Sequence, residues 1–510
     1  MASKVPVFDV ARELSSRLMN ELVKSKNTLS SVLYDLDSNT DGKGATSYLA
    51  KESFKLEPSV STYMSRDDDL ELGRSSTLHF EGYTNDTTYI TELNISLTLP
   101  PLVIDTTKRP HNRTAIGYVY NFLHHYFDIS LYLNHNKLCN ITPTISDLNY
   151  YNMTPEKRKA YDECVGNTPD LLTSGVDETE GRLTLPSKKV VFPVDVGSLF
   201  PLMMQTQNSS NDRFRITIES KPFLDGILIR SLGAAATSVG NDIITKNDIR
   251  TINSMSQLVP LGDVKYGVSY KVNKTHYQFA VPKDGFKLYE RLQEIDQREL
   301  KNIHENGESV EIYAGLHTRA HCMLKNVTKE QNRAITGSEQ GVYGLNPDAN
   351  GGGDVVAETS LKFHGNDHAQ TLDNVFTQKM LPYRSFGVTY PSGIHLLYDY
   401  AYNNIELSNA INTVNLGPKL SFVFTDASKY NSWKDKLTEM TYKPKFETTV
   451  VISEICGLMY NPGKPTKFVN SKNTLNLAKV TPIRNVGDDD DATAAAPPNA
   501  TNTDDQMDVL

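Results

Sequence analysis

Apolar and polar residues alternate between Ile90 and Leu99, and this pattern leaves few conformations open to the segment. A two-residue period places the apolar side chains of an extended chain on one face. Pro100 and Pro101 follow at once, and proline has no backbone N–H to donate to a neighbouring strand. The pattern therefore predicts a half-buried strand of an antiparallel sheet that ends at the two prolines.

Similar short strand-like segments recur along the chain. They cover residues 129–133, 183–185, 189–192 and 214–218 in the first half, and residues 268–272, 277–281, 393–398, 405–407, 420–424 and 448–452 in the second half. Turn-forming residues such as proline, asparagine and glycine bound several of them. Because no convincing long helix separates most of these strands, the pattern favours β-sandwiches over a parallel α/β sheet.

Two segments have the period of a helix instead. Residues 7–36 carry apolar side chains every three or four positions, which predicts an amphipathic helix. The apolar face of this helix must pack against another surface. The alternatives are its own domain, a neighbouring subunit and an inner membrane surface. Residues 286–303 are the second helical candidate. The polar, glycine-rich insertion at residues 337–354 predicts an exposed surface loop.

A length of 510 residues requires two or more domains. We predict an N-terminal helix with a polar linker in residues 1–51, a first sandwich in residues 52–258 and a second sandwich in residues 259–470. Residues 471–510 form an acidic tail with seven carboxylates, three basic residues and few large apolar groups. Such a composition cannot offset the entropy cost of ordering, so we predict that the tail is disordered.

Charge and cysteine content exclude several classes of protein. The net charge of −9 and the lack of a long basic block argue against direct, sequence-specific binding of nucleic acid. Four scattered cysteines, Cys139, Cys164, Cys322 and Cys456, include no C-x-x-C pair and predict free thiols that pack inside the protein in a reducing compartment. The sequence starts without a secretory signal and contains no run of about eighteen apolar residues, so we expect neither secretion nor a membrane span.

A series of motifs also follows one another in a specific order. The first half contains Leu99-Pro-Pro101, Ile116-Gly-Tyr-Val-Tyr-Asn121-Phe, Asn152-Met-Thr-Pro-Glu156 with Tyr161, Val165-Gly-Asn167, Leu183-Thr-Leu-Pro186 and Leu199-Phe-Pro-Leu202. The second half contains Met380-Leu-Pro-Tyr383 and Tyr390-Pro-Ser-Gly393. In this order the motifs resemble those of the double jelly-roll major capsid proteins of nucleocytoplasmic large DNA viruses and their relatives, the virophages and polinton-like viruses. The resemblance covers roughly residues 75–460.

The resemblance implies an all-β protein of two consecutive eight-stranded antiparallel jelly-roll sandwiches, with short helices in loops and the N-terminal amphipathic helix. It also implies a major capsid protein whose homotrimers form pseudo-hexagonal capsomers of an icosahedral virion shell, assembled in the host cytoplasm. The partners would be further copies of the chain, penton and minor capsid proteins, and an inner membrane touched by the N-terminal helix. The loop at residues 337–354 would face outward.

Two other functions share this architecture. One is a trimeric scaffold protein that forms honeycomb lattices on immature particles. The other is a carbohydrate-acting enzyme or lectin with twin jelly rolls, because a fold does not fix a function. An enzyme of that kind needs two carboxylates about 5 to 10 Å apart in an aromatic-lined cleft, and no such pair stands out in the sequence.

The histidines do not predict a metal or catalytic site. His364 and His368 flank a turn-forming Gly-Asn pair and have no evident third ligand. His317 and His321 lie in a strand-like segment, which favours packing in the core. The adjacent His124 and His125 are predicted to begin a strand, where successive side chains point to opposite faces and cannot cooperate.

Other candidate sites also lack the required pattern. Asp67, Asp68 and Asp69 lack the ligand spacing of a calcium loop and predict a solvated loop. No phosphate-binding, dinucleotide-binding or nucleophile-elbow motif occurs. The sequence therefore predicts no catalytic residue, no cofactor-binding residue and no metal ligand, and the chain is not expected to be an enzyme.

Overall fold

The computed structural model describes most of the chain between Pro58 and Asn470. The described residues are 58–71, 76–83, 88–105, 115–118, 120–172, 174–177, 182–200, 202–204, 213–220, 229–232, 249–253, 255–260, 265–277, 285–299, 308–311, 316–326, 356–363, 366–391, 393–400, 411–412, 419–424, 446–461 and 464–470. The predicted N-terminal helix, the insertion at 337–354, the strand at 405–407 and the acidic tail lie outside these residues.

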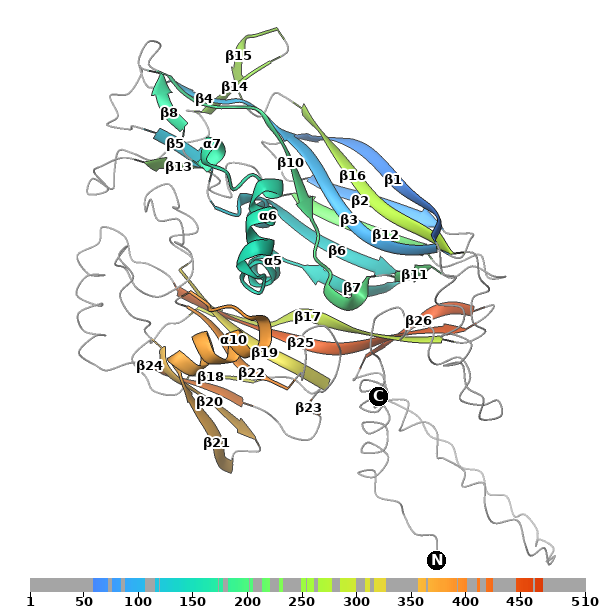
Figure 1. Cartoon of the computed structure of the whole chain (residues 1–510), viewed down its shortest axis with the longest axis vertical. Coiled ribbons are helices and arrows are strands. Elements are labelled where there is room, and N and C mark those ends of the chain that lie inside the picture. Colours follow the sequence, from blue (N-terminus) through green and yellow to red (C-terminus); the bar gives the residue numbers. More distant parts are fainter. Residues whose placement is uncertain are drawn as a thin grey trace, which may run out of the picture.

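The first sandwich consists of two antiparallel sheets. One sheet has the order β1 (Pro58–Glu71), β16 (Lys265–Tyr277), β3 (Thr88–Leu99) and β10 (Lys188–Pro193), and β11 (Leu202–Met204) also pairs with β3. The other sheet has the order β2 (Ser76–Tyr83), β12 (Arg213–Ser220), β6 (Phe127–Leu133) and β7 (Asn136–Ile141). Figure 1 shows the two sheets stacked in the upper part of the molecule.

The second sandwich is built in the same way. One sheet has the order β17 (Gly285–Glu299), β25 (Phe446–Asn461), β19 (Leu316–Asn326) and β22 (Ile394–Asp399). In addition, β23 (Ile411–Asn412) pairs with β19, and β26 (Lys464–Asn470) pairs with β25. The other has the order β18 (Glu308–Glu311), β24 (Lys419–Phe424), β20 (Val356–Phe363) and β21 (Asn366–Asp373).

The two sandwiches repeat one topology. When the strands of the four-membered paths are numbered along the chain within each sandwich, both sandwiches have the sheet orders 1-8-3-6 and 2-7-4-5. This double Greek-key arrangement, with the first and last strands as neighbours, is a jelly roll. The prediction of two consecutive jelly-roll sandwiches is therefore confirmed for the described part of the chain.

A further sheet covers one end of the first sandwich. Its order is β13 (Ile229–Leu232), β5 (Ala115–Tyr118), β8 (Ser174–Asp177), β9 (Arg182–Leu185), β4 (Leu102–Asp105), β14 (Ile249–Ile252) and β15 (Leu258–Pro260). All seven strands come from the connections β3–β6, β7–β10 and β12–β16, which leave the sandwich at the same end (Figure 1). We call this sheet the end sheet.

Short helices occupy corresponding connections of the two sandwiches. The connection from β7 to β10 contains α5 (Pro143–Tyr151), α6 (Pro155–Val165) and α7 (Pro169–Leu172), and the connection from β21 to β22 contains η5 (Phe376–Met380) and α10 (Leu381–Phe386). The other short helices among the described residues are α4 (Phe122–Tyr126) and η3 (Gly197–Leu199). Proline begins α5 and α6, and the preceding Thr142 and Thr154 side chains accept a backbone N–H of the first turn.

The alternation of apolar and polar residues between Ile90 and Leu99 is visible in the core. Leu93, Ile95, Leu97 and Leu99 on β3 are at most 2% exposed. Burial of each such side chain contributes about 1.5–3 kcal/mol relative to an exposed position. The strand ends at Leu99, as the prolines predict.

One helical prediction is wrong. Residues 286–303 were expected to form a helix, but residues 285–299 form the long strand β17, which pairs with β25 along its whole length. The segment is rich in Glu, Lys, Leu, Gln and Arg, which favour helices. Pairing with β25 overrides this weak local preference, because it satisfies the backbone groups of the whole segment.

The pairing of β16 corrects the boundary between the sandwiches. The segment at 268–272 was expected to open the second sandwich from residue 259, but β16 lies between β1 and β3 in the first. The last strand of a jelly roll pairs beside its first strand, so a boundary set by the next alternating segment falls one strand too early. The structure also places Asp67, Asp68 and Asp69 within β1, opposite Gly267 to Ser269, and not in a loop.

Candidate functional site

His124 and His125 do cooperate, contrary to the sequence prediction. They lie in the short helix α4, and both rings approach the carboxylate of Asp147 on α5. The Nδ1 atom of His124 is 2.6 Å from Asp147 Oδ1, and the Nε2 atom of His125 is 3.5 Å from Oδ2. Successive side chains of a helix are about 100° apart, whereas those of a strand point to opposite faces, and this difference explains the error.

The other nitrogen of His124 is also occupied. Its Nε2 atom lies 2.8 Å from the hydroxyl of Tyr161 on α6. A histidine held by a carboxylate is the arrangement of a general base. Here, however, the ring is fully buried, and its second nitrogen contacts a tyrosine whose pKa is raised well above 10, chiefly by burial. The contacts of His124 with Asp147 and Tyr161 therefore link α4 to α5 and α6.

A second polar cluster links α5 and α6 to Tyr120 and Asn121, the two residues before α4. The Tyr120 hydroxyl donates to Asp162 Oδ2 at 2.9 Å and lies 2.6 Å from the Tyr150 hydroxyl. Asn167 Nδ2 donates to Asp162 Oδ1 at 2.8 Å and to Asn121 Oδ1 at 2.7 Å. Burial raises the pKa of Tyr120 to about 12, so its hydroxyl stays protonated and able to donate. Three of the sequence motifs, those with Asn121, Tyr161 and Asn167, thus contribute side chains to these two clusters.

Two motif glycines are required by their surroundings. A Cβ atom at Gly117 would lie 1.7 Å from the backbone oxygen of Leu172. Gly166 ends α6 with φ of 87°, a conformation that favours glycine. These positions let α7 and the end of α6 approach the rest of the sandwich closely.

The prediction that His317 and His321 pack in the core is confirmed. Both lie on β19 and are at most 1% exposed. His368 lies on the strand β21, and His364 lies outside the described residues. Within the described part of the chain, no group of three or more His, Cys, Asp or Glu side chains could hold a metal ion.

All four cysteines are free, and three of them are buried. Cys164 is the exception, because it is exposed on α6. The prediction that every cysteine packs inside the protein is therefore wrong at this position.

In the part of the chain that can be described, no helix is both long and apolar enough to cross a lipid bilayer.

The two sandwiches are joined by contacts that we call the seam. Tyr289 on β17 is fully buried, and its hydroxyl donates to the backbone oxygen of Leu138 on β7 at 3.0 Å. Thr142 at the start of α5 donates to Glu294 on β17, and Tyr390 after α10 donates to Asn152 at the end of α5. The seam therefore links strands and helices of both sandwiches.

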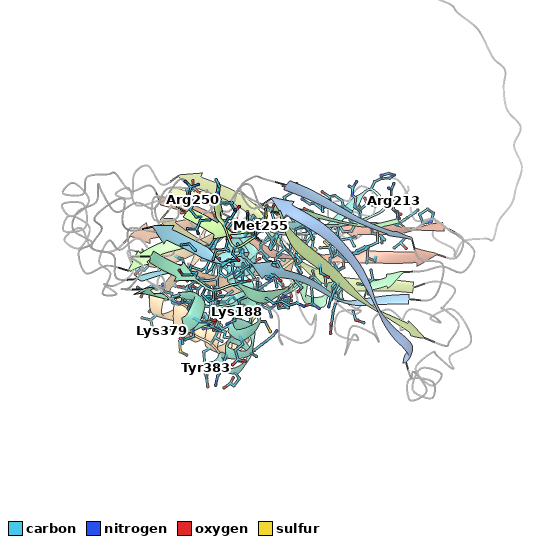
Figure 2. All side chains as sticks on the ribbon, turned by 90° about the horizontal axis from the view of Figure 1, so that it is seen from above. Lys188, Arg213, Arg250, Met255, Lys379 and Tyr383 are labelled. Atoms are coloured by element: carbon cyan, nitrogen blue, oxygen red, sulfur yellow. The ribbon has the colours of Figure 1, made fainter. Side chains whose placement is uncertain are left out.

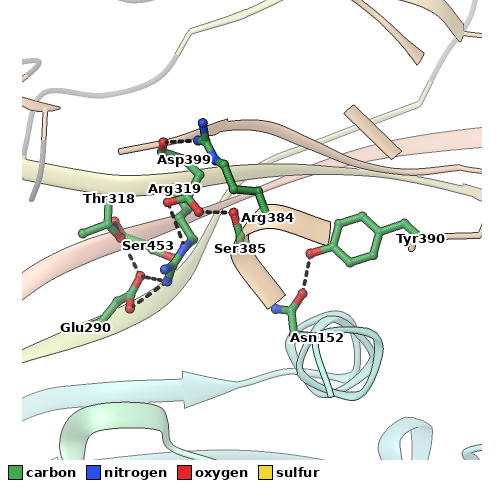
Figure 3. A network of polar contacts seen from close by, with 9 residues as sticks. All are labelled: Asn152, Glu290, Thr318, Arg319, Arg384, Ser385, Tyr390, Asp399 and Ser453. Carbon is green, nitrogen blue, oxygen red and sulfur yellow. Dashed lines mark hydrogen bonds and ion pairs between the residues drawn. The ribbon is translucent and has the colours of Figure 1, made fainter. Parts of the chain in front are cut away.

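A charged cluster lies beside the seam under α10 (Figure 3). Arg319 on β19 donates to Asp399 Oδ1 at 3.1 Å and to both oxygens of Glu290 at 3.3 Å. Ser385 on α10 donates to the other oxygen of Asp399. The Arg319 guanidinium also stacks over Phe386, 5.0 Å from the ring centroid. Through Ser385 and Phe386, these contacts hold α10 against the sheet of the second sandwich.

The large exposed apolar side chains of the described residues fall in two places. Ile252, Met255 and Leu258 lie on the β14–β15 hairpin of the end sheet and are 40–73% exposed. Val375, Met380 and Tyr383 lie on or beside η5 and α10 and are 52–68% exposed. Figure 2 shows Met255 and Tyr383 on opposite sides of the molecule, both toward the same end of the strands. We call these surfaces the hairpin patch and the helix patch.

Comparison with solved structures agrees with the topology. A chain of a quasi-atomic model of the PBCV-1 virus capsid superposes with a TM-score of 0.50 at 12% identity, over 81% of this chain and 98% of that one. PBCV-1 VP54, fitted into a reconstruction of the virophage Sputnik, gives a TM-score of 0.51 at 12% identity with the same coverage. The fold is that of double jelly-roll capsid proteins. No protein-family model and no curated protein sequence matches the chain.

The double jelly-roll fold accounts for the order of the sequence motifs. Each motif lies at the end of a strand or in a helix-containing connection of one of the two sandwiches. Asp147 and Asp162 have no signal in the sequence, because the histidine, tyrosine and asparagine partners of these carboxylates come together only when α4, α5 and α6 pack.

Proposed function

We propose that the chain is a structural capsid protein whose copies build an icosahedral virion shell. The observation that carries the proposal is the repeat of one jelly-roll topology in a single chain, which superposes on the PBCV-1 capsid chain over 98% of that chain. Two sandwiches joined by a buried seam give a subunit with two lobes. Three such subunits around a threefold axis form a six-lobed, pseudo-hexagonal capsomer.

The exposed apolar patches support self-association. Contiguous apolar surface on a soluble protein commonly marks an interaction site. A cyclic trimer has head-to-tail contacts, which join two different surfaces of neighbouring subunits. The hairpin patch and the helix patch are two such surfaces on opposite sides of the molecule. We expect each subunit contact to bury more than about 2,000 Å², as obligate assemblies do.

The proposal includes the partners and the location that a shell requires. Copies of the chain would contact one another within and between capsomers, and penton and minor capsid proteins would complete the shell. The N-terminal segment would reach an inner membrane, and assembly would take place in the host cytoplasm. The proposal assigns no catalytic activity, since the carboxylates gathered under α10, Glu290 and Asp399, are both bound by Arg319.

Size-exclusion chromatography with light scattering tests the proposal. A particle of three times the 57.0 kDa chain mass is expected. A monomer at micromolar concentration that binds glycans would contradict it and favour the carbohydrate-acting alternative. The honeycomb scaffold also predicts trimers, and it is distinguished by the composition of mature particles. A shell protein remains in them, whereas a scaffold is removed.

A further inference from the structure

His321 occupies a buried site that offers its ring no hydrogen bond. It lies on β19 and is 1% exposed, and neither ring nitrogen has a hydrogen-bond partner in the structure. The rings of Phe386, at the end of α10, and Tyr390, four residues later, lie 6.2 Å from the imidazole, measured between centroids. The last residue of α10 and a residue just beyond the helix therefore lie against the imidazole.

The charged groups around this site do not favour an imidazolium. Arg319, two residues away on the same strand, acts electrostatically on His321, and it already binds Glu290 of β17 and Asp399 of β22. Further basic groups among the described residues are Arg384 of α10, which donates to the backbone oxygen of Asp399 at 3.3 Å, and Arg158 of α6, which acts electrostatically on Tyr390. Burial, and then the positive charge of Arg319, lower the pKa of His321 from 6.5 to about 3.

The cover of His321 also reaches the other sandwich. The Tyr390 hydroxyl donates to Asn152 at the end of α5, which belongs to the first sandwich (Figure 3). A protonated imidazole needs an acceptor or water for both of its N–H groups. Because the rings of Phe386 and Tyr390 lie against the imidazole, movement of residues 381–390 away from β19 would let water reach it. The same movement would break the Tyr390–Asn152 contact.

We infer that His321 makes the attachment of residues 381–390 acid-sensitive, so that protonation of its imidazole releases α10 and weakens the seam between the two sandwiches. In the released state the ring is hydrated and has an ordinary pKa near 6.5. The released state thus binds the proton more tightly than the closed state. The ratio of released to closed molecules therefore rises roughly tenfold for each pH unit below 6.5, until the pH approaches 3.

Hydrogen–deuterium exchange of the full chain at pH 7 and pH 5 tests this inference. After correction for intrinsic exchange rates, the protection of backbone amides in residues 381–390 should fall about 25-fold in the wild type. It should change less than about threefold in His321→Phe, which fills the site with an apolar ring. His135→Asn, at an exposed histidine in the β6–β7 turn, should behave like the wild type.

Three results would overturn the inference. One is wild-type protection that is unchanged between pH 7 and pH 5, which decides the question even if His321→Phe does not fold. Another is a loss of protection on acidification in His321→Phe, or in the smaller His321→Leu, that is as large as the loss in the wild type. The third is a loss that spreads evenly over β3 and β6, which would indicate global unfolding. That a shell loosens in acid rests on the proposed function, but exchange reports on the chain whether or not it self-associates.

Discussion

Single buried polar residues hold the helices onto the first sandwich. Asp147 is the clearest case, because one carboxylate contacts two buried histidines from a different helix. A buried pair of this kind contributes little to the net free energy of unfolding. Removal of one partner, however, leaves the other buried without a hydrogen bond. The cost of a substitution should therefore depend on burial more than on the presence of an ion pair.

Asp147→Ala tests this dependence. We expect the free energy of unfolding to fall by about 3 kcal/mol, because His124 loses a buried partner at 2.6 Å. The matched control is Asp170→Ala, which breaks the half-exposed Lys188–Asp170 pair at 2.8 Å and should cost less than about 1 kcal/mol. Both are measured by urea denaturation, and equal losses would contradict the interpretation.

Gly117→Ala tests the close approach of α7. The added Cβ atom would meet the backbone oxygen of Leu172, so the backbone must shift, and we expect a loss of at least about 2 kcal/mol. Gly197→Ala serves as the comparison, since its φ of 58° is strained for alanine but no atom lies within 4 Å. It should lose only about 1–2 kcal/mol. A smaller loss at Gly117 than at Gly197 would show that the approach is not tight.

The cysteines should differ sharply in reactivity. Burial raises the pKa of Cys139 to about 12, and it raises that of Cys456 still further, so neither forms the reactive thiolate near neutral pH. Cys322 is buried as well, whereas Cys164 is exposed. At pH 8 a thiol reagent should modify one cysteine rapidly in the folded chain and four after denaturation. Rapid reaction of two or more would place a buried cysteine at the surface.

At the scale of elements, the sequence was informative where local pattern and pairing agree. The strand β3 could be predicted because apolar and polar residues alternate along it and two prolines follow it. Both features indicate a half-buried strand, and the burial of its apolar side chains agrees with them. The strand β17 could not, because its residues favour a helix and only the distant β25 makes it extended. The position of β16 in the first sandwich likewise depends on partners far away in the sequence.

The candidate site was predictable to a lesser degree. The motifs that contain Asn121, Tyr161 and Asn167 were recognised only by their order along the chain. The structure shows that Asn167 donates to Asn121 and that Tyr161 contacts His124. The short helix α4 was not expected, so the convergence of His124 and His125 on Asp147 was missed. A helix of five residues is too short to show a period in the sequence.

The helix patch provides the prediction at the element scale. Replacing Met380 and Tyr383 together by Asp places two charges on an exposed apolar surface, and it should convert trimers into monomers without loss of secondary structure. The control is Lys159→Asp on the exposed face of α6, which should leave the trimer intact. Light scattering and circular dichroism give the two readouts. If the double variant still forms trimers, α10 is not part of the interface between subunits.

At the scale of the whole molecule, the seam should make the two sandwiches one cooperative unit. Tyr289 is buried between them, and hydrogen bonds cross from β17 to β7 and from Tyr390 to Asn152. We expect a single thermal transition in calorimetry, with equal calorimetric and van't Hoff enthalpies. Two separate transitions of similar size would show that the sandwiches unfold independently.

Electron microscopy of the purified full-length protein tests the claim of a shell-forming subunit most directly. Class averages should show particles with threefold symmetry and six lobes, two from each chain. Isolated two-lobed particles at the same concentration would contradict it.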